Sequence, residues 1–379
     1  MIANSTNDAV KHNSFNIFTN KRILVTGHTG FKGSWLTTWL KLLGAEIIGI
    51  SLDPVTNPSN FVASKVYEGI TDLRIDLRDL KSVKDIISEF QPDYVFHLAA
   101  QAIVSESYLD PVKTWETNVI GTINLLEGIR QLKHPTVAIL VTSDKCYRNF
   151  EWVWGYREND ELGGDDPYSA SKAATELAIN SYVKSYFSRG DNSHLRIATA
   201  RAGNVIGGGD WSVNRIIPDC IIRSVNGEKV LIRNPSSIRP WQHVLEPLSG
   251  YLSLAVEMSK GKVNNGESFN FGPCDNKHFS VLQLVKELKT NWNQINWENS
   301  NLESANYSET NFLKLNCEKA MQEIKWQSTL DFEQTVSFTA EWYKTYYNNA
   351  SMSQNLTITQ LLNFCEIAKE KGIAWAQTS

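Results

Sequence analysis

Short apolar runs alternate with amphipathic patterns along the first half of the chain. The run RILVTG is followed by SWLTTWLKLLG, where apolar residues recur at helical spacing, and then by the apolar run IIGISL. A strand, a helix and a second strand within about 30 residues predict a βαβ unit. The crossover in such a unit makes the two strands parallel and predicts a sheet that is buried on both faces.

The same alternation continues as far as residue 205. Strands are indicated by PDYVFHLAA, VAILVTS and RIATARAGNVIG, and helices by VKTWETNVIGTINLLEGIRQL and YSASKAATELAINSYVKSYF. Repetition of the unit predicts an α/β fold with a doubly wound parallel sheet of the Rossmann type.

The rhythm breaks after residue 205, where a run of three glycines precedes shorter elements and proline-containing turns. We expect a smaller α/β lobe here, covering the carboxyl ends of the strands, where ligands of such sheets bind. Some of its segments can return to the first domain. The expected parts are a polar, disordered or loosely docked tail over 1–20, a nucleotide-binding domain over 21–205, a mainly substrate-binding lobe over 206–350 and a helical extension over 351–379.

Composition and charge narrow the classes of function. The 379 residues carry a net charge of -4 and the charges are dispersed, which argues against a nucleic-acid partner. The five cysteines form no CxxC pair and the histidines do not cluster with them, so we expect reduced thiols, no metal and a cytoplasmic protein. Residues 1–20 lack the apolar segment of a signal peptide or membrane span, so no membrane partner is expected.

The stretch TGHTGFKG places three glycines between the first strand and the first helix. Gly27 permits a tight turn, Gly30 lets a pyrophosphate approach the backbone, and Gly33 permits close packing of helix on sheet. The N–H groups at the start of the helix then face the anion. Because turns collect glycine in any case, the strand before the loop and the helix after it are what favour a dinucleotide site.

Two aspartates follow later strands of the predicted sheet. Asp53 closes IIGISLD, where it can accept hydrogen bonds from an adenine ribose 2′-OH and would repel a 2′-phosphate, which favours NAD over NADP. It could equally be a turn aspartate before Pro54. Asp76 ends LRIDL and could touch the adenine.

The stretch VTSDKCY ends an apolar run with the adjacent pair Asp144 and Lys145, which on its own is typical of a solvated ion pair. Further along, DDPYSASKAATEL begins a helix at Pro167, so Tyr168 and Lys172 share one helix face. A cationic Lys172 would lower the pKa of the phenol, and the tyrosinate could then remove a proton from a sugar hydroxyl. Taken alone, this spacing also fits a surface Tyr-Lys pair.

The three stretches TGHTGFKG, VTSDK and YSASK together resemble the extended short-chain dehydrogenase/reductase family. Further matches, GHTGFKGSWL, RAGNVIGGGDW, RIIPD and RPWQHVLEPLSGY, are similar to the sugar-nucleotide 4,6-dehydratases that act on CDP-glucose, where Asp-Lys replaces the usual Asp-Glu. The resemblance implies a hydro-lyase with tightly bound NAD, which oxidises C4 of CDP-glucose, eliminates water across C5–C6 and returns the hydride to C6. The product would supply deoxysugars for a surface polysaccharide such as O-antigen.

The same resemblance implies the catalytic roles. Asp144 is the acid for loss of water, Lys145 the base at C5, Tyr168 the base at O4, Lys172 the residue that tunes Tyr168 and holds the ribose, and Ser143 a hydrogen-bond donor to O4. A lysine base must be neutral, although its ordinary pKa is about 10.4. Burial and neighbouring cations would lower this pKa and Asp144 would raise it. The alternative is a charged Lys145 that stabilises the C4 enolate.

Binding residues also follow from the resemblance. Asn118 either supports the active-site backbone or is a satisfied core amide. Arg215 and Arg239 suit phosphate oxygens, but each could instead be a surface charge. The expected NAD-binding residues are Gly27, Thr29, Gly30, Phe31, Lys32, Gly33, Asp53, Asp76, Leu77, Leu98, Ala99, Ala100, Asn118, Tyr168 and Lys172. The expected substrate-binding residues are Gln101, Asn204, Arg215 and Arg239.

Assembly and three rival functions stay open. Residues 112–132 and 168–187 carry apolar side chains on more than one helix face, which fits a homodimer or tetramer with a four-helix contact but also a helix buried within the monomer. The first two rival functions are another nucleotide-sugar dehydratase, for dTDP- or GDP-hexose, and a 4-epimerase on the same fold, which would invert C4 and lose no water. A dinucleotide-binding protein without turnover is a third reading, although it would have no need of Asp144, Lys145, Tyr168 and Lys172 together.

Overall fold

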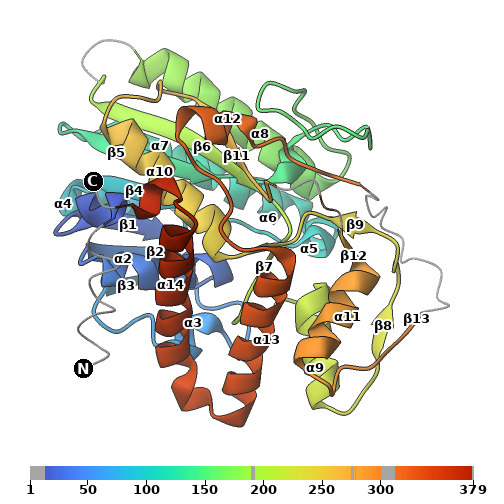
Figure 1. Cartoon of the computed structure of the whole chain (residues 1–379). Coiled ribbons are helices and arrows are strands. Elements are labelled where there is room, and N and C mark those ends of the chain that lie inside the picture. Colours follow the sequence, from blue (N-terminus) through green and yellow to red (C-terminus); the bar gives the residue numbers. More distant parts are fainter. Residues whose placement is uncertain (1–12, 189–192, 275–276, 278, 300–311, 378–379) are drawn as a thin grey trace.

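Seven parallel strands form the central sheet of the computed structural model, which describes residues 13–188, 193–274, 277, 279–299 and 312–377 (Figure 1). Their order is β11-β6-β5-β4-β1-β2-β3, and it reverses between β1 and β4. This confirms the predicted doubly wound sheet, with a seventh strand contributed from beyond residue 205. The bounds are β1 Arg22–Thr26, β2 Glu46–Ser51, β3 Thr71–Arg74, β4 Tyr94–His97, β5 Thr136–Val141, β6 Leu195–Ala202 and β11 Ser268–Phe271.

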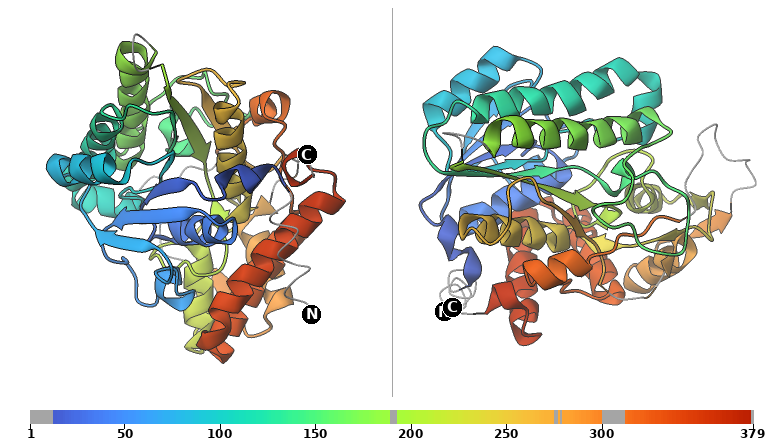
Figure 2. Two further views of the ribbon diagram at one scale, coloured as in Figure 1. Left: turned by 90° about the vertical axis from the view of Figure 1, so that its left-hand side faces the viewer. Right: turned by 90° about the horizontal axis from the view of Figure 1, so that it is seen from above.

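Alternation along each strand supplies one apolar cluster to each face of the sheet. In β1, for example, Ile23 and Val25 join one cluster and Leu24 joins the other. The helices therefore lie in two layers, as the turned views of Figure 2 show. One layer contains α4 (Leu80–Phe90), α7 (Gly121–Ile129) and α8 (Pro167–Tyr182), and the other contains α2 (Phe31–Leu42) and α10 (Leu245–Ser259).

Two of the helices widen into π-helical turns. The helix that begins at α6 (Pro111–Trp115) passes through the π-helix η2 (Glu116–Ile120) into α7, and α8 runs on into the π-helix η4 (Val183–Phe187). The start of α8 is as predicted, because Pro167 is its first residue and the Asp166 side chain accepts a hydrogen bond from the N–H of Ser169 at 2.9 Å.

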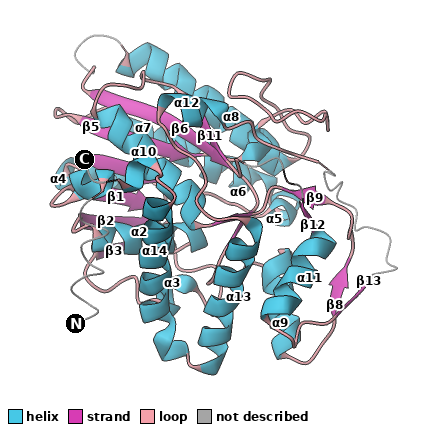
Figure 3. Ribbon diagram, in the orientation of Figure 1, coloured by secondary structure: helices cyan, strands magenta, loops and turns pink. Residues whose placement is uncertain are grey.

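The chain after β6 builds three two-stranded sheets and several helices beside the main sheet (Figure 3). The paired strands are β7 (Val205–Ile206) with β10 (Gln242–His243), β9 (Ile238–Arg239) with β12 (Phe279–Ser280), and β8 (Val230–Ile232) with β13 (Trp297–Asn299). The later helices are α9 (Ile216–Val225), α11 (Val281–Asn291), α12 (Glu318–Glu323), α13 (Phe332–Asn348) and α14 (Ser353–Glu370), and two short ones, α3 (Asn60–Ala63) and α5 (Val104–Leu109), lie earlier.

The start of the described chain is firmly docked. Phe15 and Phe18, in the short helix η1 (Ser14–Phe18), are fully buried. Phe15 stacks on Trp375 in η7 (Ala374–Ala376) with ring centroids 4.9 Å apart. The prediction of a disordered or loose tail is therefore wrong for residues 13–20, because these two aromatic rings complete the core, while residues 1–12 lie outside the described part.

None of the helices in the described part of the chain combines the length and the apolar character that a membrane span requires.

Candidate active site

The glycine loop between β1 and α2 is shaped by close backbone contacts. Gly27 has a positive φ of 74°, and a Cβ there would lie 2.7 Å from the backbone nitrogen of Ala99. A Cβ on Gly33 would lie 2.0 Å from the carbonyl oxygen of Gly27. Gly30 is the N-cap of α2 and provides no side-chain cap, so backbone N–H groups of the first turn can face an anion. This loop could hold a pyrophosphate.

The glycine loop is hydrogen-bonded to the end of β2 and lies beside a network of charged side chains. Thr29 Oγ1 lies 2.7 Å from Ser51 Oγ and donates to the carbonyl of Leu52 at 3.0 Å, so it braces the loop. Asp53 is 88 % exposed and accepts a hydrogen bond from Arg74 Nε at 2.8 Å. Arg74 also pairs with Asp72, which in turn contacts His28 Nε2 at 2.7 Å. His28, Asp72 and Arg74 were not predicted, since only their tertiary contacts connect them to Asp53.

Other expected NAD-binding residues follow β3 and β4. Asp76 follows β3 and is held by Arg78, whose hydrogen bond lowers the pKa of its carboxyl group. Leu77 is buried and faces Gly121, where a Cβ would lie 3.1 Å from the Leu77 Cβ. Residues 98–100 follow β4, and the close contact of Gly27 with Ala99 brings them to the glycine loop.

Asn118 is hydrogen-bonded to the backbone of Gln101. Asn118 Oδ1 accepts from the N–H of Gln101 at 2.9 Å, and its Nδ2 donates to the carbonyl of Gln101 at 3.1 Å and to Ser171 Oγ at 2.9 Å. Gln101 uses its side-chain amide on the backbone of Ile103 and on Thr114. Asn118 is thus a satisfied core amide that also supports the active-site backbone, joining the loop after β4 to α8.

The Ser143-Asp144-Lys145 segment forms a tight turn directly after β5. Ser143 Oγ donates to Asp144 Oδ1 at 3.0 Å and accepts from the N–H of Lys145 at 3.2 Å, which starts the 3-10 helix η3 (Asp144–Cys146). Ser143 and Asp144 are buried, whereas Lys145 is partly exposed. Asp144 and Lys145 therefore lie in different surroundings, whereas both members of a solvated surface pair would be exposed.

Tyr168 and Lys172 on α8 are both buried beside this turn. Burial raises the pKa of Tyr168 to about 12, opposed by a hydrogen bond with Ser143 and by the charge of Arg215. Loss of hydration therefore outweighs the favourable contacts of this phenol. Burial also lowers the pKa of Lys172 to about 8, so this amine is close to neutrality at a mildly basic pH.

Cations gather around the catalytic turn. Burial and the charges of Arg215 and Lys172 together lower the pKa of Lys32 to about 8, against the opposing charge of Asp144. Arg215, the residue before α9, pairs with Asp210 Oδ2 at 2.8 Å. Lys32 and Arg215 come from elements far apart in the sequence, and their convergence on Asp144 suits a ligand that carries negative charge.

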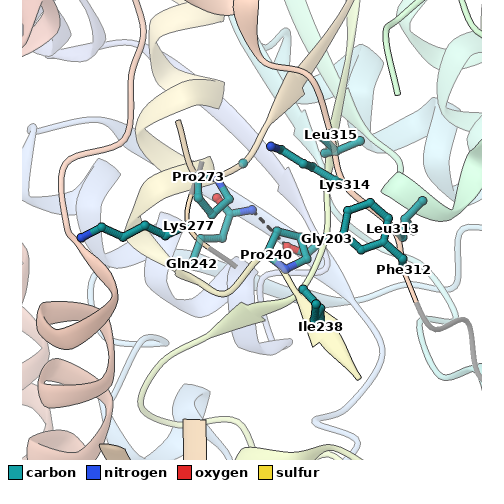
Figure 4. A pocket seen from close by; sticks show the side chains of 11 residues that line it. Gly203, Ile238, Pro240, Gln242, Pro273, Lys277, Phe312, Leu313, Lys314 and Leu315 are labelled. Carbon is teal, nitrogen blue, oxygen red and sulfur yellow. Dashed lines mark hydrogen bonds between the residues drawn. The ribbon is translucent and has the colours of Figure 1, made fainter. Parts of the chain in front are cut away.

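A pocket lies next to the turn, where β6 ends. Gly203 lines it, and a Cβ on Gly203 would lie 1.8 Å from Asp144 Oδ2. Figure 4 shows Gln242 reaching the carbonyl of Gly203, a hydrogen bond of 3.0 Å from Nε2. Asn204 follows in a left-handed conformation with φ 48°. The other residues that line this pocket are Ile238, Pro240, Gly272, Pro273, Lys277, Phe312, Leu313, Lys314 and Leu315.

Arg239, expected to bind substrate, lies next to the pocket residues Ile238 and Pro240. Its Nη1 donates to the carbonyl of Ile238 at 2.9 Å. The importance of Gly203 and of the segment 312–315 was not predicted. Gly203 carried a signal, since it is a glycine in the strand end RAGN, whereas nothing in the sequence links residues 312–315 to Asp144.

No group of three metal-ligating side chains occurs within the described ranges of the chain.

Comparisons with known proteins agree with this geometry. The family model described as GDP-mannose 4,6 dehydratase matches residues 24–339. The chain is 42% identical to a CDP-glucose 4,6-dehydratase from Salmonella typhimurium over 89% of this chain and 94% of that protein. It is 27% identical to a dTDP-glucose 4,6-dehydratase from Haemophilus influenzae, over 87% and 99%. A UDP-glucose 4-epimerase from Thermus thermophilus, solved in complex with NAD, shares the fold with a TM-score of 0.72 at 24% identity, over 85% and 99%.

Replacing Gly203 by alanine should disable the site. The new methyl group would overlap Asp144 Oδ2 and push the carboxylate out of its position, and a displacement of about 1 Å can cost about 100-fold in rate. The matched control is Gly272→Ala, which lines the same pocket but has its nearest neighbour, Cys317 Sγ, at 3.5 Å. We expect kcat to fall about 100-fold for Gly203→Ala and to change little for Gly272→Ala. Equal effects in the two variants would contradict the assignment.

Proposed function

Because the chain belongs to the GDP-mannose 4,6-dehydratase family, we propose that it catalyses the NAD-dependent 4,6-dehydration of CDP-D-glucose. The observation that carries this proposal is the buried Asp144 beside Lys145, in a turn that faces Tyr168 and Lys172. An oxidoreductase without elimination needs only the last two. The similarity to the Salmonella dehydratase supports CDP-glucose as the substrate, with CDP-4-dehydro-6-deoxy-D-glucose as the product.

The nucleotide loop fits NAD. Gly27 and Gly33 let the loop pack closely on the backbone of Ala99 and of Gly27 itself, and α2 begins without a side-chain cap, so its first N–H groups are available to a pyrophosphate. Asp53 would hold the adenine ribose, and Lys172 the nicotinamide ribose. NAD, when bound, accepts a hydride from C4 of the sugar and returns it to C6 after water is lost.

Ser143 and Tyr168 act on the C4 hydroxyl in this proposal. Tyr168 takes the proton from O4 and the Ser143 hydroxyl donates a hydrogen bond to O4 as negative charge develops there. Because burial raises the pKa of Tyr168 to about 12, the phenolate needs the help of neighbouring groups. Ser143 and Arg215 both lower the pKa of this phenol, so they favour the form that accepts the proton.

Asp144 and Lys145 carry the elimination. Oxidation at C4 makes the C5 proton acidic, Lys145 removes it, and Asp144 protonates the departing C6 hydroxyl. The alternative, a charged Lys145 that stabilises the C4 enolate, uses the same location. Asn204, Arg215 and Arg239 would bind the diphosphate, with Gln101 nearby, although the side-chain amide of Gln101 is already bonded to Ile103 and Thr114.

A substrate panel in D₂O tests the reaction. Incubation with CDP-, dTDP-, GDP- and UDP-glucose should give a 4-dehydro-6-deoxy product from the CDP sugar, with solvent deuterium at C5. An inverted C4 without loss of water would establish a 4-epimerase, the activity of a protein that shares this fold. Dehydration of another sugar alone would replace the substrate, and no turnover would favour a dinucleotide-binding protein.

Replacing Lys145 by methionine separates the two halves of the reaction. We expect hydride transfer to persist, visible as absorbance of bound NADH, while product formation falls by about 100-fold or more, the usual weight of a general base. The control is Lys262→Met, a lysine beyond the far end of α10 that pairs with Glu257 at 3.0 Å. A Lys145→Met variant that fails to reduce NAD would contradict the assignment.

We also propose that the chain forms a homodimer or tetramer in the cytoplasm and supplies deoxysugars for a surface polysaccharide such as O-antigen. The five cysteines all lie in the described part of the chain and are not joined in disulfides, which suits a reducing compartment. Exposed apolar residues lie at the end of α5, on the continuous helix α6-η2 and on α8, and this supports a four-helix contact with a second copy. They are Leu109, Val112, Trp115, Ile120 and Leu177.

Charges in this apolar surface should separate the dimer. The double variant Val112→Asp/Leu177→Asp would bury two carboxylates at the contact, so sedimentation at micromolar concentration should show a monomer. The control, Val55→Asp, places a carboxylate on a valine that is 95% exposed in a loop after β2. A monomeric unmutated chain, or an unchanged assembly of the double variant, would contradict the proposal.

A further inference from the structure

A buried ion pair lies behind the catalytic turn. Glu176 on α8 and Arg201 on β6 are each 3% exposed, and they meet twice, from Nε at 2.8 Å and from Nη2 at 2.9 Å. Arg201 also donates from Nη1 to Tyr147 Oη at 2.7 Å and to the carbonyl of Glu158 at 2.9 Å. Glu176 accepts from Thr142 at 2.5 Å and from Thr199 at 3.0 Å. The hydrogen-bonding capacity of both charges is thus well used.

The same ion pair forms hydrogen bonds with the residues on both sides of the catalytic turn. Thr142 is the residue before Ser143, and its hydroxyl is bonded to Glu176. Tyr147 follows η3, and its hydroxyl accepts from Arg201 while its ring lies 4.9 Å from the guanidinium carbon. Residues 143–146 are therefore suspended between two anchors that share one ion pair, and Glu176 is one helical turn beyond Lys172 on α8.

Stability alone does not explain such a pair. Taking two charges out of water costs free energy that their attraction often fails to recover, and apolar replacements of similar volume can be neutral or stabilising. Polar networks that are fully satisfied do, however, hold one arrangement of the groups around them. Here those groups are the two ends of the turn that carries Asp144.

We propose that the Glu176–Arg201 ion pair is the positioning element of this active site, which holds the Asp144-Lys145 turn against α8 and keeps the Lys172 amine cationic. The prediction that elimination is the affected step rests on the proposed function. The attachment of the turn to the ion pair through Thr142 and Tyr147 is independent of that function.

The charge of Lys172 depends on few neighbours. The groups that act on it or on which it acts are Glu176 on the same helix, Cys146 in η3, His97 on β4 and Lys32 on α2. Burial lowers the pKa of His97 to about 3 and raises the pKa of Cys146, so both are uncharged near pH 7. Glu176 is then the neighbouring anion that raises the pKa of Lys172. Removing its charge should shift the loss of cationic Lys172 to lower pH.

Glu176→Gln tests both functions of the pair, with Glu246→Gln as the matched control. Glu246, at the start of α10, is another buried acidic side chain. It accepts hydrogen bonds from the backbone N–H groups of Thr329 and Leu330. Glu176→Gln should slow elimination at least 30-fold and hydride transfer less than 5-fold, estimates in keeping with a displaced acid. The basic limb of the pH profile of turnover should move to lower pH in this variant, because Lys172 loses its proton at a lower pH than in the unmutated chain. Glu246→Gln should change neither the relative rates of the two steps nor the position of the basic limb.

Three further variants keep the test decisive if Glu176→Gln folds poorly. Thr142→Val removes one anchor in a side chain of the same shape and should slow elimination, and Thr142→Ser should restore it. Glu176→Leu/Arg201→Met should keep a thermal midpoint near that of the unmutated chain but remain slow in elimination. Recovered elimination in this double variant, or equal slowing of both steps without a shifted limb, would overturn the proposal.

Amide hydrogen exchange examines the turn without any substrate. Peptides that cover residues 142–147 should exchange at least 10-fold faster in Glu176→Gln than in Glu246→Gln, because local opening becomes easier when an anchor is lost. Unchanged exchange would overturn the positioning role even in an active enzyme. Faster exchange in a chain that turns over no sugar nucleotide would leave the positioning role supported and reject only the proposed function.

Discussion

Parallel pairing of β5 with β4 and β6 is the interaction on which the site depends. Parallel strands end at a common edge, so the residues after β4, β5 and β6 meet there even though they are far apart in the chain. The loop at Gln101, the turn at Ser143 and the strand end at Gly203 all follow from this register. Because β1 is parallel to β4, the glycine loop after β1 opens onto the same edge, at the point where the strand order reverses.

Close contact and burial then give these loops their chemistry. Glycine at 27, 33 and 203 is required because the backbone or the Asp144 carboxylate occupies the space of a side chain. The same exclusion of water raises the pKa of Tyr168 and lowers the pKa values of Lys32 and Lys172. The proposed reaction needs a phenol that can lose its proton and an amine that stays charged, so each buried group requires a neighbour of suitable charge.

The sequence predicted the loops better than the contacts between them. Hydrophobic alternation and the glycine spacing were enough for the sheet, for α2 and for the start of α8 at Pro167. The prediction of a loose tail was wrong for residues 13–20, because polar residues outnumber Phe15 and Phe18, yet those two rings fill the core. The pKa of Tyr168 shows a similar limit, since a sequence shows the lysine four residues away but not the depth of burial.

The sequence by itself determined which groups stand next to one another along the chain: the glycine loop, the Ser143-Asp144-Lys145 run and the spacing of Tyr168 and Lys172. These are local patterns, and local backbone preferences suffice to place them on strand ends and a helix face. Only the tertiary structure decided that Gly203 packs on Asp144, that Arg74 pairs with Asp53, and that Glu176 and Arg201 hold both ends of one turn. Such contacts join residues distant in sequence, and burial, which sets their strength, exists only in the folded chain.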